Sequence, residues 1–286
     1  MKYNRVAITF GGDFLAFLKK LKKMDKILIG VGVALVIVLV VVIIFFESAD
    51  KVTAPDNIPM LEVTTTTETT TTTTTTETTT TTTTVTYDYE MQIDMDKVKE
   101  YHEANEDVVG WVYVGDTVID YPIVQSDDND YYLERDWQGN SSHSGSIFED
   151  FRGTIGETEH TLLYGHNMAS GAMFHAVKNF KDESWGNEHI YFEVASLDTR
   201  YLYRIVACSV LNGLEGADFE YWNYITLDEE EYDDFIETIR DTALIWYAPE
   251  DDEPEYGDNL IVLQTCNSGS DDGIRCILFG QCLGEY

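Results

Sequence analysis

The feature that most constrains this chain is an unbroken apolar run at residues 27–46. These 20 residues carry no charge, and as a helix they are long enough to cross about 30 Å of hydrocarbon. β-Branched residues would lie on every face of that helix, which disfavours a buried core helix. A cleavable signal peptide is disfavoured too, because the run is longer than a usual signal-peptide core and no clean cleavage site follows it. The sequence therefore predicts a retained membrane anchor.

Charge is distributed unevenly around this run. Residues 1–26 contain seven of the 18 basic residues and two of the 52 acidic ones, so the rest of the chain carries 11 basic and 50 acidic residues. Positive charge beside a membrane span favours the cytoplasmic side. We therefore expect a basic cytoplasmic segment at 1–26, a single-pass transmembrane anchor at 27–46, and an extracellular remainder. The net charge of −34 excludes ordinary nucleic-acid binding, which needs clustered Lys and Arg.

A low-complexity segment follows the apolar run. Residues 64–84 are all Thr except Glu68 and Glu77, and such a segment cannot bury apolar surface by itself. Residues 47–93 are therefore predicted to form an extracellular linker with a Thr-rich stalk at 64–84. Such a spacer would hold a folded domain at residues 94–286 away from the bilayer.

Strand-like patterns dominate the folded domain. Runs rich in Val, Ile and Tyr recur at strand length, and Gly115-Asp116 between two of them indicates a two-residue hairpin turn. Pro122 is expected to end the ordinary pairing of the second strand of that hairpin. The domain is large enough to bury a substantial core, and its pattern favours one β-barrel-like domain decorated by helices.

Two helices stand out among the strands. A short amphipathic helix is expected after Asp94, because Met95, Val98 and Tyr101 recur at helical spacing. A longer helix is expected at residues 227–245, where Thr226 and Glu229 have the spacing of a capping box. Its apolar residues at helical spacing are assigned to core packing: Tyr232, Phe235, Ile236, Ile239 and Ala243.

The cysteine spacing argues against both a disulfide framework and a zinc site. Cys276 and Cys282 fall in one apparent strand, six residues and so about 20 Å apart, which is too far for a bridge. No CxxC pair or Cys/His ligand spacing is present in the sequence.

Three short strings carry the candidate chemistry. Cys266 ends the apolar run LIVLQTC, His166 follows TLLYG, and Arg275 stands among apolar residues in IRCILF. A strand end is a stiff platform that can hold a nucleophile at the mouth of a cleft. Each string alone is a weak signal, because a single Cys is often a small buried hydrophobic residue and a single His is commonly structural.

Together the three strings resemble the sortases, particularly class B. Sortases carry a His in a strand-loop segment, a Cys in a TLxTC motif and an Arg shortly downstream; YGHN, VLQTC and IRCIL supply them here in the same order. Further segments of class B type extend over roughly residues 95–283. Val262 stands in place of the motif's first Thr, and Ser268 stands where some class B members have an acid. Asp271 or Asp272 therefore stays open as a group that orients the His.

The resemblance implies both a fold and a reaction. The fold would be mainly β with helices: a sortase-type closed β-barrel with an N-terminal helix and a long helix before the catalytic Cys strand. Cys266 would be the nucleophile, His166 the proton-transfer partner and Arg275 the stabiliser of the substrate carbonyl. The candidates for substrate binding are Thr265, Asn167 and Ser268.

The implied partners are proteins and amines. The enzyme would cleave the C-terminal sorting signal of exported proteins through a thioacyl intermediate, and transfer them to an amine of a peptidoglycan precursor or of a pilin. The resemblance implies no metal and no organic cofactor.

Two other functions compete with this interpretation. Papain-like hydrolases also use Cys and His, but their Cys comes well before their His, opposite to the order here. A non-catalytic, stalked cell-surface binding module would have Cys266 as a core residue. A thiol-directed reagent at neutral pH separates these cases, because a buried structural thiol stays inert.

Overall fold

The computed structural model describes residues 63–72, 78–267 and 273–286. Most of its strands belong to one sheet: β3 (Val108–Tyr113), β4 (Asp120–Val124), β5 (Ile147–Glu149), β6 (His160–Tyr164), β7 (Tyr191–Ala195), β8 (Arg200–Asn212), β9 (Ala243–Trp246), β10 (Leu260–Cys266) and β11 (Ile274–Glu285). Helical segments join them: α3 (Met95–Ala104), η1 (Tyr131–Glu134), η2 (Phe174–Lys181), α4 (Glu183–Glu188), η3 (Tyr221–Asn223) and α5 (Glu229–Thr242).

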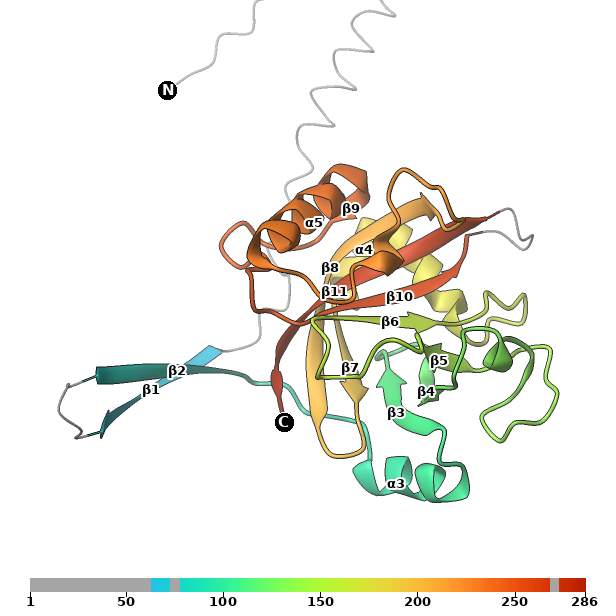
Figure 1. Cartoon of the computed structure of the whole chain (residues 1–286), viewed down its shortest axis with the longest axis horizontal. Coiled ribbons are helices and arrows are strands. Elements are labelled where there is room, and N and C mark those ends of the chain that lie inside the picture. Colours follow the sequence, from blue (N-terminus) through green and yellow to red (C-terminus); the bar gives the residue numbers. More distant parts are fainter. Residues whose placement is uncertain (1–62, 73–77, 268–272) are drawn as a thin grey trace, which may run out of the picture. The chain divides into compact units, whose positions relative to one another are not determined.

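Within these described residues, eight strands close into a barrel (Figure 1). The strand order is β11-β10-β6-β5-β4-β3-β7-β8, and β11 pairs back with β8 to complete the ring. β9 pairs with β8 outside it. The closed, mainly β fold with an N-terminal helix, α3, and a long helix before the Cys strand, α5, is confirmed.

Both predicted helices form, but the long one has different bounds from those predicted. Asp94 caps α3 by accepting hydrogen bonds from the backbone N–H groups of the first turn. The long helix is capped by Asp228 and Glu231, two residues later than expected, and this pair makes a complete capping box. The chain leaves the helix at Ala243 and continues as β9, so the predicted helix was too long at both ends.

The predicted hairpin also forms, but with a longer turn. Its strands β3 and β4 end and begin at Tyr113 and Asp120, and the turn is closed by the Thr117 hydroxyl, which donates to the carbonyl of Val114. Pro122 lies inside β4 opposite Trp111, so the expectation that it ends the pairing was wrong. The pairing of β4 with β5 covers only Ile123 and Val124, so Pro122 has no partner on β5 that would need its missing N–H.

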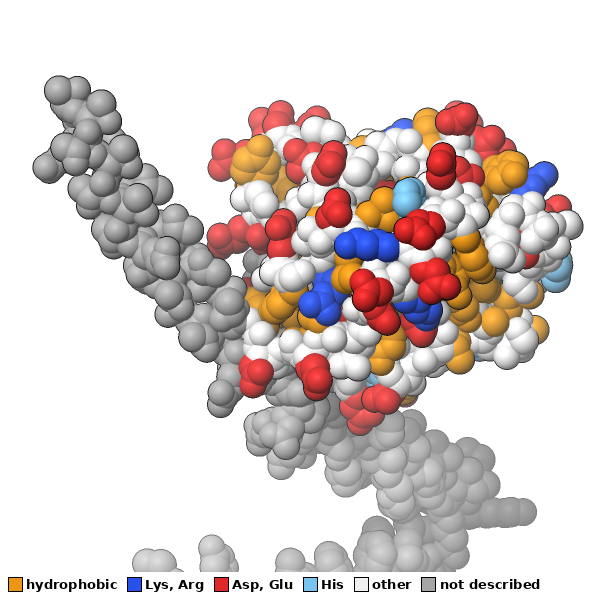
Figure 2. Space-filling view, turned by 90° about the horizontal axis from the view of Figure 1, so that it is seen from below, with side chains coloured by type: hydrophobic (Ala, Val, Ile, Leu, Met, Phe, Trp, Pro, Cys, Tyr) orange, Lys and Arg blue, Asp and Glu red, His pale blue; other side chains and the backbone are white. Residues whose placement is uncertain are grey.

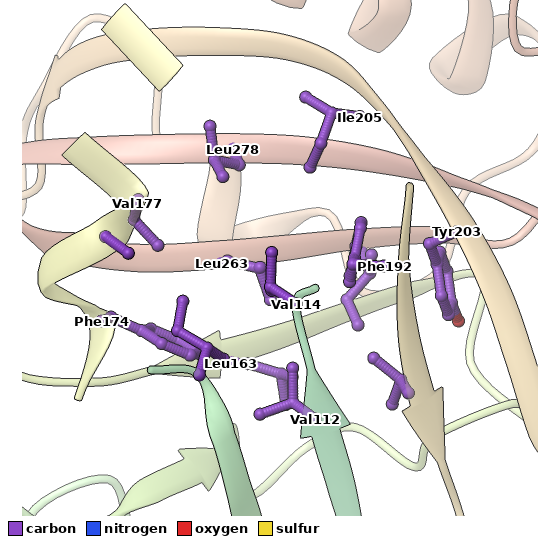
Figure 3. Packing of buried hydrophobic residues seen from close by; sticks show 14 of the residues in the cluster. Val112, Val114, Leu163, Phe174, Val177, Phe192, Tyr203, Ile205, Leu263 and Leu278 are labelled. Carbon is purple, nitrogen blue, oxygen red and sulfur yellow. The ribbon is translucent and has the colours of Figure 1, made fainter. Parts of the chain in front are cut away.

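The two largest hydrophobic clusters of the described residues lie on opposite faces of the barrel wall. The inner core holds side chains from opposite strands and from η2, which Figure 3 shows converging on one another. The outer core lies between the wall and α5, whose buried residues are Tyr232, Phe235, Ile236 and Ile239. Successive residues of a strand face opposite sides. Along β10 this puts Ile261 and Leu263 in the inner core and Leu260 and Val262 in the outer core.

The Thr-rich segment is paired in the structure. β1 (Val63–Thr72) and β2 (Thr78–Tyr87) form a two-stranded antiparallel sheet, in register from Val63 opposite Tyr87 to Thr72 opposite Thr78. Thr is β-branched and favours extended backbone, which explains why two such runs pair as strands. The expected stalk is therefore a strand pair in its described part, while residues 73–77 lie outside that part.

The predicted localisation needs a correction. Among the residues that the structure describes, no helix has the length and apolar character needed to cross a bilayer. The segment 27–46, which was assigned to the membrane, lies outside the described residues together with the rest of 1–62. A single-pass membrane protein with an extracellular domain is thus not supported, and that prediction is withdrawn.

The surface reflects the acidic composition. On the face shown in Figure 2, Asp and Glu side chains lie around and between the few basic ones. The described residues include exposed acidic stretches such as Glu229 to Glu231 at the start of α5.

Glu149 is a buried acid that makes the stability of the barrel depend on pH. Its side chain is 1% exposed, and its Oε1 atom has no hydrogen-bond partner. Burial, assisted by the neighbouring charge of Asp150, raises the pKa of Glu149 to about 8. The folded state therefore keeps a proton that the unfolded chain releases, so stability falls as the pH rises from about 4.5 to about 8.

Glu149→Gln should remove this pH dependence. We expect the variant to be more stable than the parent by about 2–4 kcal/mol at pH 9, and to differ little at pH 5, because Gln carries no charge to bury. Denaturant unfolding at both pH values measures the difference. Parallel stability curves across this range would contradict a neutral, buried Glu149.

Candidate active site

The three predicted catalytic residues lie at neighbouring positions of the sheet: His166 just after β6, Cys266 at the end of β10 and Arg275 near the start of β11. β6 runs parallel to β10 with Tyr164 opposite Gln264, and the ladder continues through the Gly165 N–H, which donates to the Gln264 carbonyl at 3.1 Å. His166 lies two residues after Tyr164, and Cys266 lies two residues after Gln264. On the other side of β10, Cys266 is the direct partner of Arg275 on β11.

Alternation of side chains places Cys266 and Arg275 on the outer face of the barrel wall. Cys266 follows Leu260 and Val262 at the even spacing of β10, and these two residues pack in the outer core. Arg275 precedes Ile277 and Phe279 of β11, which pack there as well. Directly opposed residues in neighbouring strands have Cβ atoms about 5 Å apart. Arg275 is thus a direct neighbour of Cys266, and His166 lines the same cavity.

Among the described residues, a backbone carbonyl orients the ring of His166. The Nε2 atom of His166 lies 2.8 Å from the carbonyl oxygen of Leu133, at the end of η1. A carbonyl only accepts hydrogen bonds, so Nε2 carries a proton and Nδ1 is the ring atom that can gain or lose one. Asp271 and Asp272, the acids left open above, lie outside the described residues.

The stem of Arg275 lies against Gly213, which directly follows the neighbouring strand β8. A Cβ atom at Gly213 would come within 2.5 Å of Arg275 Cγ. Arg275 is close enough to the buried Tyr221 for its charge to lower the pKa of that phenol, against a larger rise caused by burial. Gly213 and Arg275 both line the cavity described next.

A cavity of about 890 Å³ opens over these residues. One wall comes from η1 and the segments around it, and another from η3 and the ends of β6 and β10. Its lining residues, apart from the predicted site, include Asn129, Asp130, Leu133, Glu134, Arg135, His143, Phe148, Tyr164, Trp222 and Gln264. This volume is typical of a pocket for a peptide or a drug-sized ligand.

One buried carboxylate connects the two walls of the cavity. Asp150 is fully buried and accepts hydrogen bonds from Asn129 Nδ2 and Tyr164 Oη, each at 2.9 Å. It also forms a two-point ion pair with Arg152, whose Nη2 donates to the Trp222 carbonyl at 2.8 Å. Burial alone would raise the pKa of Asp150, but the hydrogen bonds from Arg152, Asn129 and Tyr164 outweigh it and hold the pKa below 3.8.

The three predicted substrate-binding residues have different positions. Asn167 lines the cavity, and its Nδ2 donates to the carbonyl of Cys266 at 2.9 Å. Thr265 borders the cavity, but its side chain is 2% exposed, faces the other side of β10 from Cys266, and leaves Oγ1 without a hydrogen-bond partner. Ser268 lies outside the described residues. Of the three, Asn167 is thus the one placed at the cavity with its side chain engaged.

Comparisons with known proteins agree on one family. The chain is 31% identical to sortase B of Listeria monocytogenes over 177 residues, which cover 62% of this chain and 69% of that protein. Among solved structures, sortase B of Bacillus anthracis superposes with a TM-score of 0.56 at 30% identity, covering 65% of this chain and 83% of the other. Clostridium perfringens sortase B gives a TM-score of 0.59 at 26% identity, covering 65% and 99%. A comparison with models of known protein families gives no match.

The chain belongs to the sortase B family. It is therefore a sortase, a cysteine transpeptidase, and the alternative of a non-catalytic binding module is not supported. The class B sortases also account for the closed barrel, since the solved members share it.

Several cavity residues of this sortase were missed by sequence reasoning. Trp222 lies in the aromatic run FEYWNY, which could have indicated a wall of the site. Gly213 carried no signal, because its role depends on the stem of Arg275 crossing it. Leu133 contributes a backbone carbonyl, so its side chain gave no indication either.

Gly165 should be intolerant of any side chain. A Cβ atom there would lie 2.4 Å from Ile147 Cδ1 and 2.8 Å from the ring of Phe174. Gly165→Ala is expected to cost about 1–3 kcal/mol of stability by overpacking, and to lower kcat/KM about 10-fold or more by displacing His166. The matched control is Gly115→Ala, because a Cβ at Gly115 meets nothing within 4 Å. Equal effects of the two substitutions on activity and melting temperature would contradict the steric argument.

Proposed function

We propose that this sortase cleaves the C-terminal sorting signal of exported proteins and transfers the cleaved protein to an amine, through a thioacyl intermediate on Cys266. The observation that supports this is that the imidazole of His166 just after β6, the thiol of Cys266 on β10 and the guanidinium of Arg275 on β11 line one peptide-sized cavity. The acceptor amine would belong to a peptidoglycan precursor or to a pilin lysine.

The first half of the reaction forms the intermediate. The thiolate sulfur of Cys266 attacks the carbonyl carbon of the scissile peptide bond, and Arg275 donates hydrogen bonds to the oxygen as it gains negative charge. When the C–N bond breaks, the leaving amine takes a proton from the Nδ1 atom of protonated His166. The products are a thioester on Cys266 and a free C-terminal fragment.

The second half regenerates the enzyme. An incoming amine attacks the thioester carbon and gives a proton to His166, which the first step has left neutral. The C–S bond then breaks, a new amide bond forms, and Cys266 leaves as a thiolate. The proton that His166 lost in the first half returns in the second. The cycle therefore needs no external acid, base or oxidant.

Intact-mass spectrometry of the full chain tests this proposal. With an excess of a sorting-signal peptide and no amine acceptor, we expect a covalent adduct on Cys266 whose mass equals the N-terminal part of the peptide. Hydroxylamine should release the adduct as a hydroxamate, because thioesters react readily with amines. The Cys266→Ala variant should give no adduct.

A second cysteine provides the matched control. Burial raises the pKa of Cys282 to about 11, so its thiol is protonated and unreactive at neutral pH. Cys282→Ala should therefore form the adduct as the parent does. An adduct that survives in Cys266→Ala, or peptide cleavage without any adduct, would refute the thioacyl mechanism.

A further inference from the structure

The loop that follows His166 is closed on itself by backbone hydrogen bonds. The Phe174 N–H donates to the His166 carbonyl at 3.0 Å, and Asn167 forms a bridge with Met173. Met173 has a φ of 57°, a conformation that residues with a side chain rarely adopt. Such strain costs about 1–3 kcal/mol and persists only where the surroundings enforce it, often at functional sites. The loop is thus held in one shape at an energetic cost.

Asn167 connects this loop to the nucleophile strand. Its Nδ2 donates to the Cys266 carbonyl at 2.9 Å, and its Oδ1 lies 2.9 Å from Nδ1 of His175, in the first turn of η2. Only the NH₂ end of the amide can donate to a carbonyl, so the orientation of the amide is fixed. It follows that Oδ1 accepts from His175, and that the Nδ1 atom of His175 carries a proton.

The Cys266 carbonyl lies where β10 loses its partner strand. β6 ends at Tyr164, and its last ladder bond on this side runs from the Gly165 N–H to the Gln264 carbonyl. Two residues later, the side chain of Asn167 supplies the hydrogen bond that β6 no longer provides. The peptide plane after Cys266 is held from the other side by β11, where the Asn267 N–H donates to the Ile274 carbonyl at 3.0 Å.

We propose that Asn167 and His175 are positioning residues, which fix the direction of the Cys266 side chain by holding its carbonyl. The inference rests on the proposed function of Cys266 as nucleophile. Because Asn167 directly follows His166, the same bond also fixes the spacing between the imidazole and the thiol. Positioning matters at this scale, since a displacement of about 1 Å can cost about 100-fold in rate.

This role differs from the substrate contact expected of Asn167 from the sequence. Both ends of its amide bond to groups of the protein, namely the Cys266 backbone and the His175 ring. A substrate-binding side chain would mainly affect KM, whereas a positioning side chain affects kcat. His175 had no assigned role, and the hydrogen bond to Asn167 gives it one.

Three variants of the full chain test this positioning role of Asn167 and His175, which we call the clamp. Asn167→Asp keeps the shape but is ionised at neutral pH and cannot donate to the Cys266 carbonyl. His175→Phe keeps a ring but has no donor, whereas His175→Asn places an N–H near the position of Nδ1. We expect Asn167→Asp and His175→Phe to lower kcat by about 10- to 100-fold with KM changed less than about 3-fold, and His175→Asn to stay within about 3-fold of the parent.

Two readouts keep the test independent of transpeptidation. The ¹³C shift of the Cys266 carbonyl, labelled selectively at the Cys266–Asn267 bond, should move in Asn167→Asp and in His175→Phe but not in His175→Asn. The rate at which iodoacetamide alkylates Cys266 should likewise change in Asn167→Asp and in His175→Phe but not in His175→Asn. Both readouts report on the clamp even if the parent protein proves unable to transfer a peptide. Failure of peptide transfer by the parent would refute the proposed function and leave the clamp standing.

The clamp would be overturned by an unchanged carbonyl shift in both His175→Phe and Asn167→Asp. It would also be overturned if these variants raised KM and left kcat intact, because Asn167 would then contact substrate. A purely structural role predicts that all three variants lose activity only in proportion to the unfolded fraction. Circular dichroism at the assay temperature measures that fraction, and the His175 pair remains decisive if Asn167→Asp does not fold.

Discussion

Arg275→Lys is expected to lower kcat/KM for transpeptidation by about 10²- to 10³-fold, with little change in melting temperature. This equals the loss of about 2.7–4 kcal/mol of transition-state stabilisation, as seen when one oxyanion donor is removed from an enzyme. Arg275 is the direct cross-strand partner of Cys266, and its stem is held over Gly213. A planar guanidinium presents two N–H groups to one oxygen from that position, and an ammonium cannot copy this geometry.

The control for this experiment lies in the same cavity. Arg135 also lines it, but its guanidinium packs over the ring of Tyr131 and donates to the Tyr131 carbonyl. We expect Arg135→Lys to retain activity within about 5-fold, because Lys can keep the single hydrogen bond and the contact with the ring. If Arg275→Lys turned over at a near-normal rate, Arg275 would be a scaffold residue and the oxyanion role would be lost. Kinetics and thermal melts of both variants decide the matter.

The sequence predicted the chemistry of the site better than its construction. Cys266, His166 and Arg275 each stand at a strand end or among apolar strand residues, which alone is a weak signal, and the resemblance to sortases is what joined them into one site. Their arrangement depends on the parallel pairing of β6 with β10, which joins segments nearly 100 residues apart. Local patterns do not encode such pairing, so the residues could be named from the sequence but their distances from one another could not.

Element boundaries were less predictable than element types. The long helix was expected from residue 227 because Thr226 and Glu229 fit a capping box, but Asp228 and Glu231 fit one equally well and form it. The helix gives way to β9 at Ala243, where pairing with β8 outweighs the local helical pattern. Tertiary pairing of this kind overrides a weak local preference.

The contacts that hold the site were largely invisible in the sequence. His166 is oriented by a backbone carbonyl, and Asn167 holds a backbone carbonyl. Every residue type has such a carbonyl, so the sequence does not reveal either partner. Thr265 was predicted to help orient substrate; strand alternation turns its buried side chain to the face of β10 opposite Cys266, which the sequence could not show without the register. The membrane anchor and Ser268 concern residues outside the described part of the chain.

Asp150→Asn is expected to destabilise the folded domain by about 3–5 kcal/mol, the usual cost of removing one partner from a buried ion pair. Asn has one oxygen in place of two and adds an NH₂ group that faces the donors of Arg152, Asn129 and Tyr164. The guanidinium of Arg152 would lose its counter-charge. Denaturant unfolding at pH 7 measures the loss.

The surface pair of Asp120 and Lys97 provides the matched control. Asp120→Asn removes a carboxylate whose side chain is 53% exposed and lies 3.8 Å from the Lys97 amine, so we expect a loss of at most about 1 kcal/mol. A similar small loss for Asp150→Asn would mean that the Asp150 network adds little to stability.

Asp150→Asn should also change substrate binding and the dependence of stability on acidic pH. Asn129, Tyr164 and Trp222 line the cavity and are joined through Asp150 and Arg152, so loosening this network should raise KM more than it lowers kcat. Because the pKa of Asp150 is held below 3.8, its contribution is present above that pH and is lost as the pH falls through the folded-state pKa. The stability gap between parent and Asp150→Asn should therefore narrow below about pH 4, while the Asp120→Asn gap stays small throughout. A gap that stayed constant into acid would show that the carboxylate charge of Asp150 is not what joins the cavity walls.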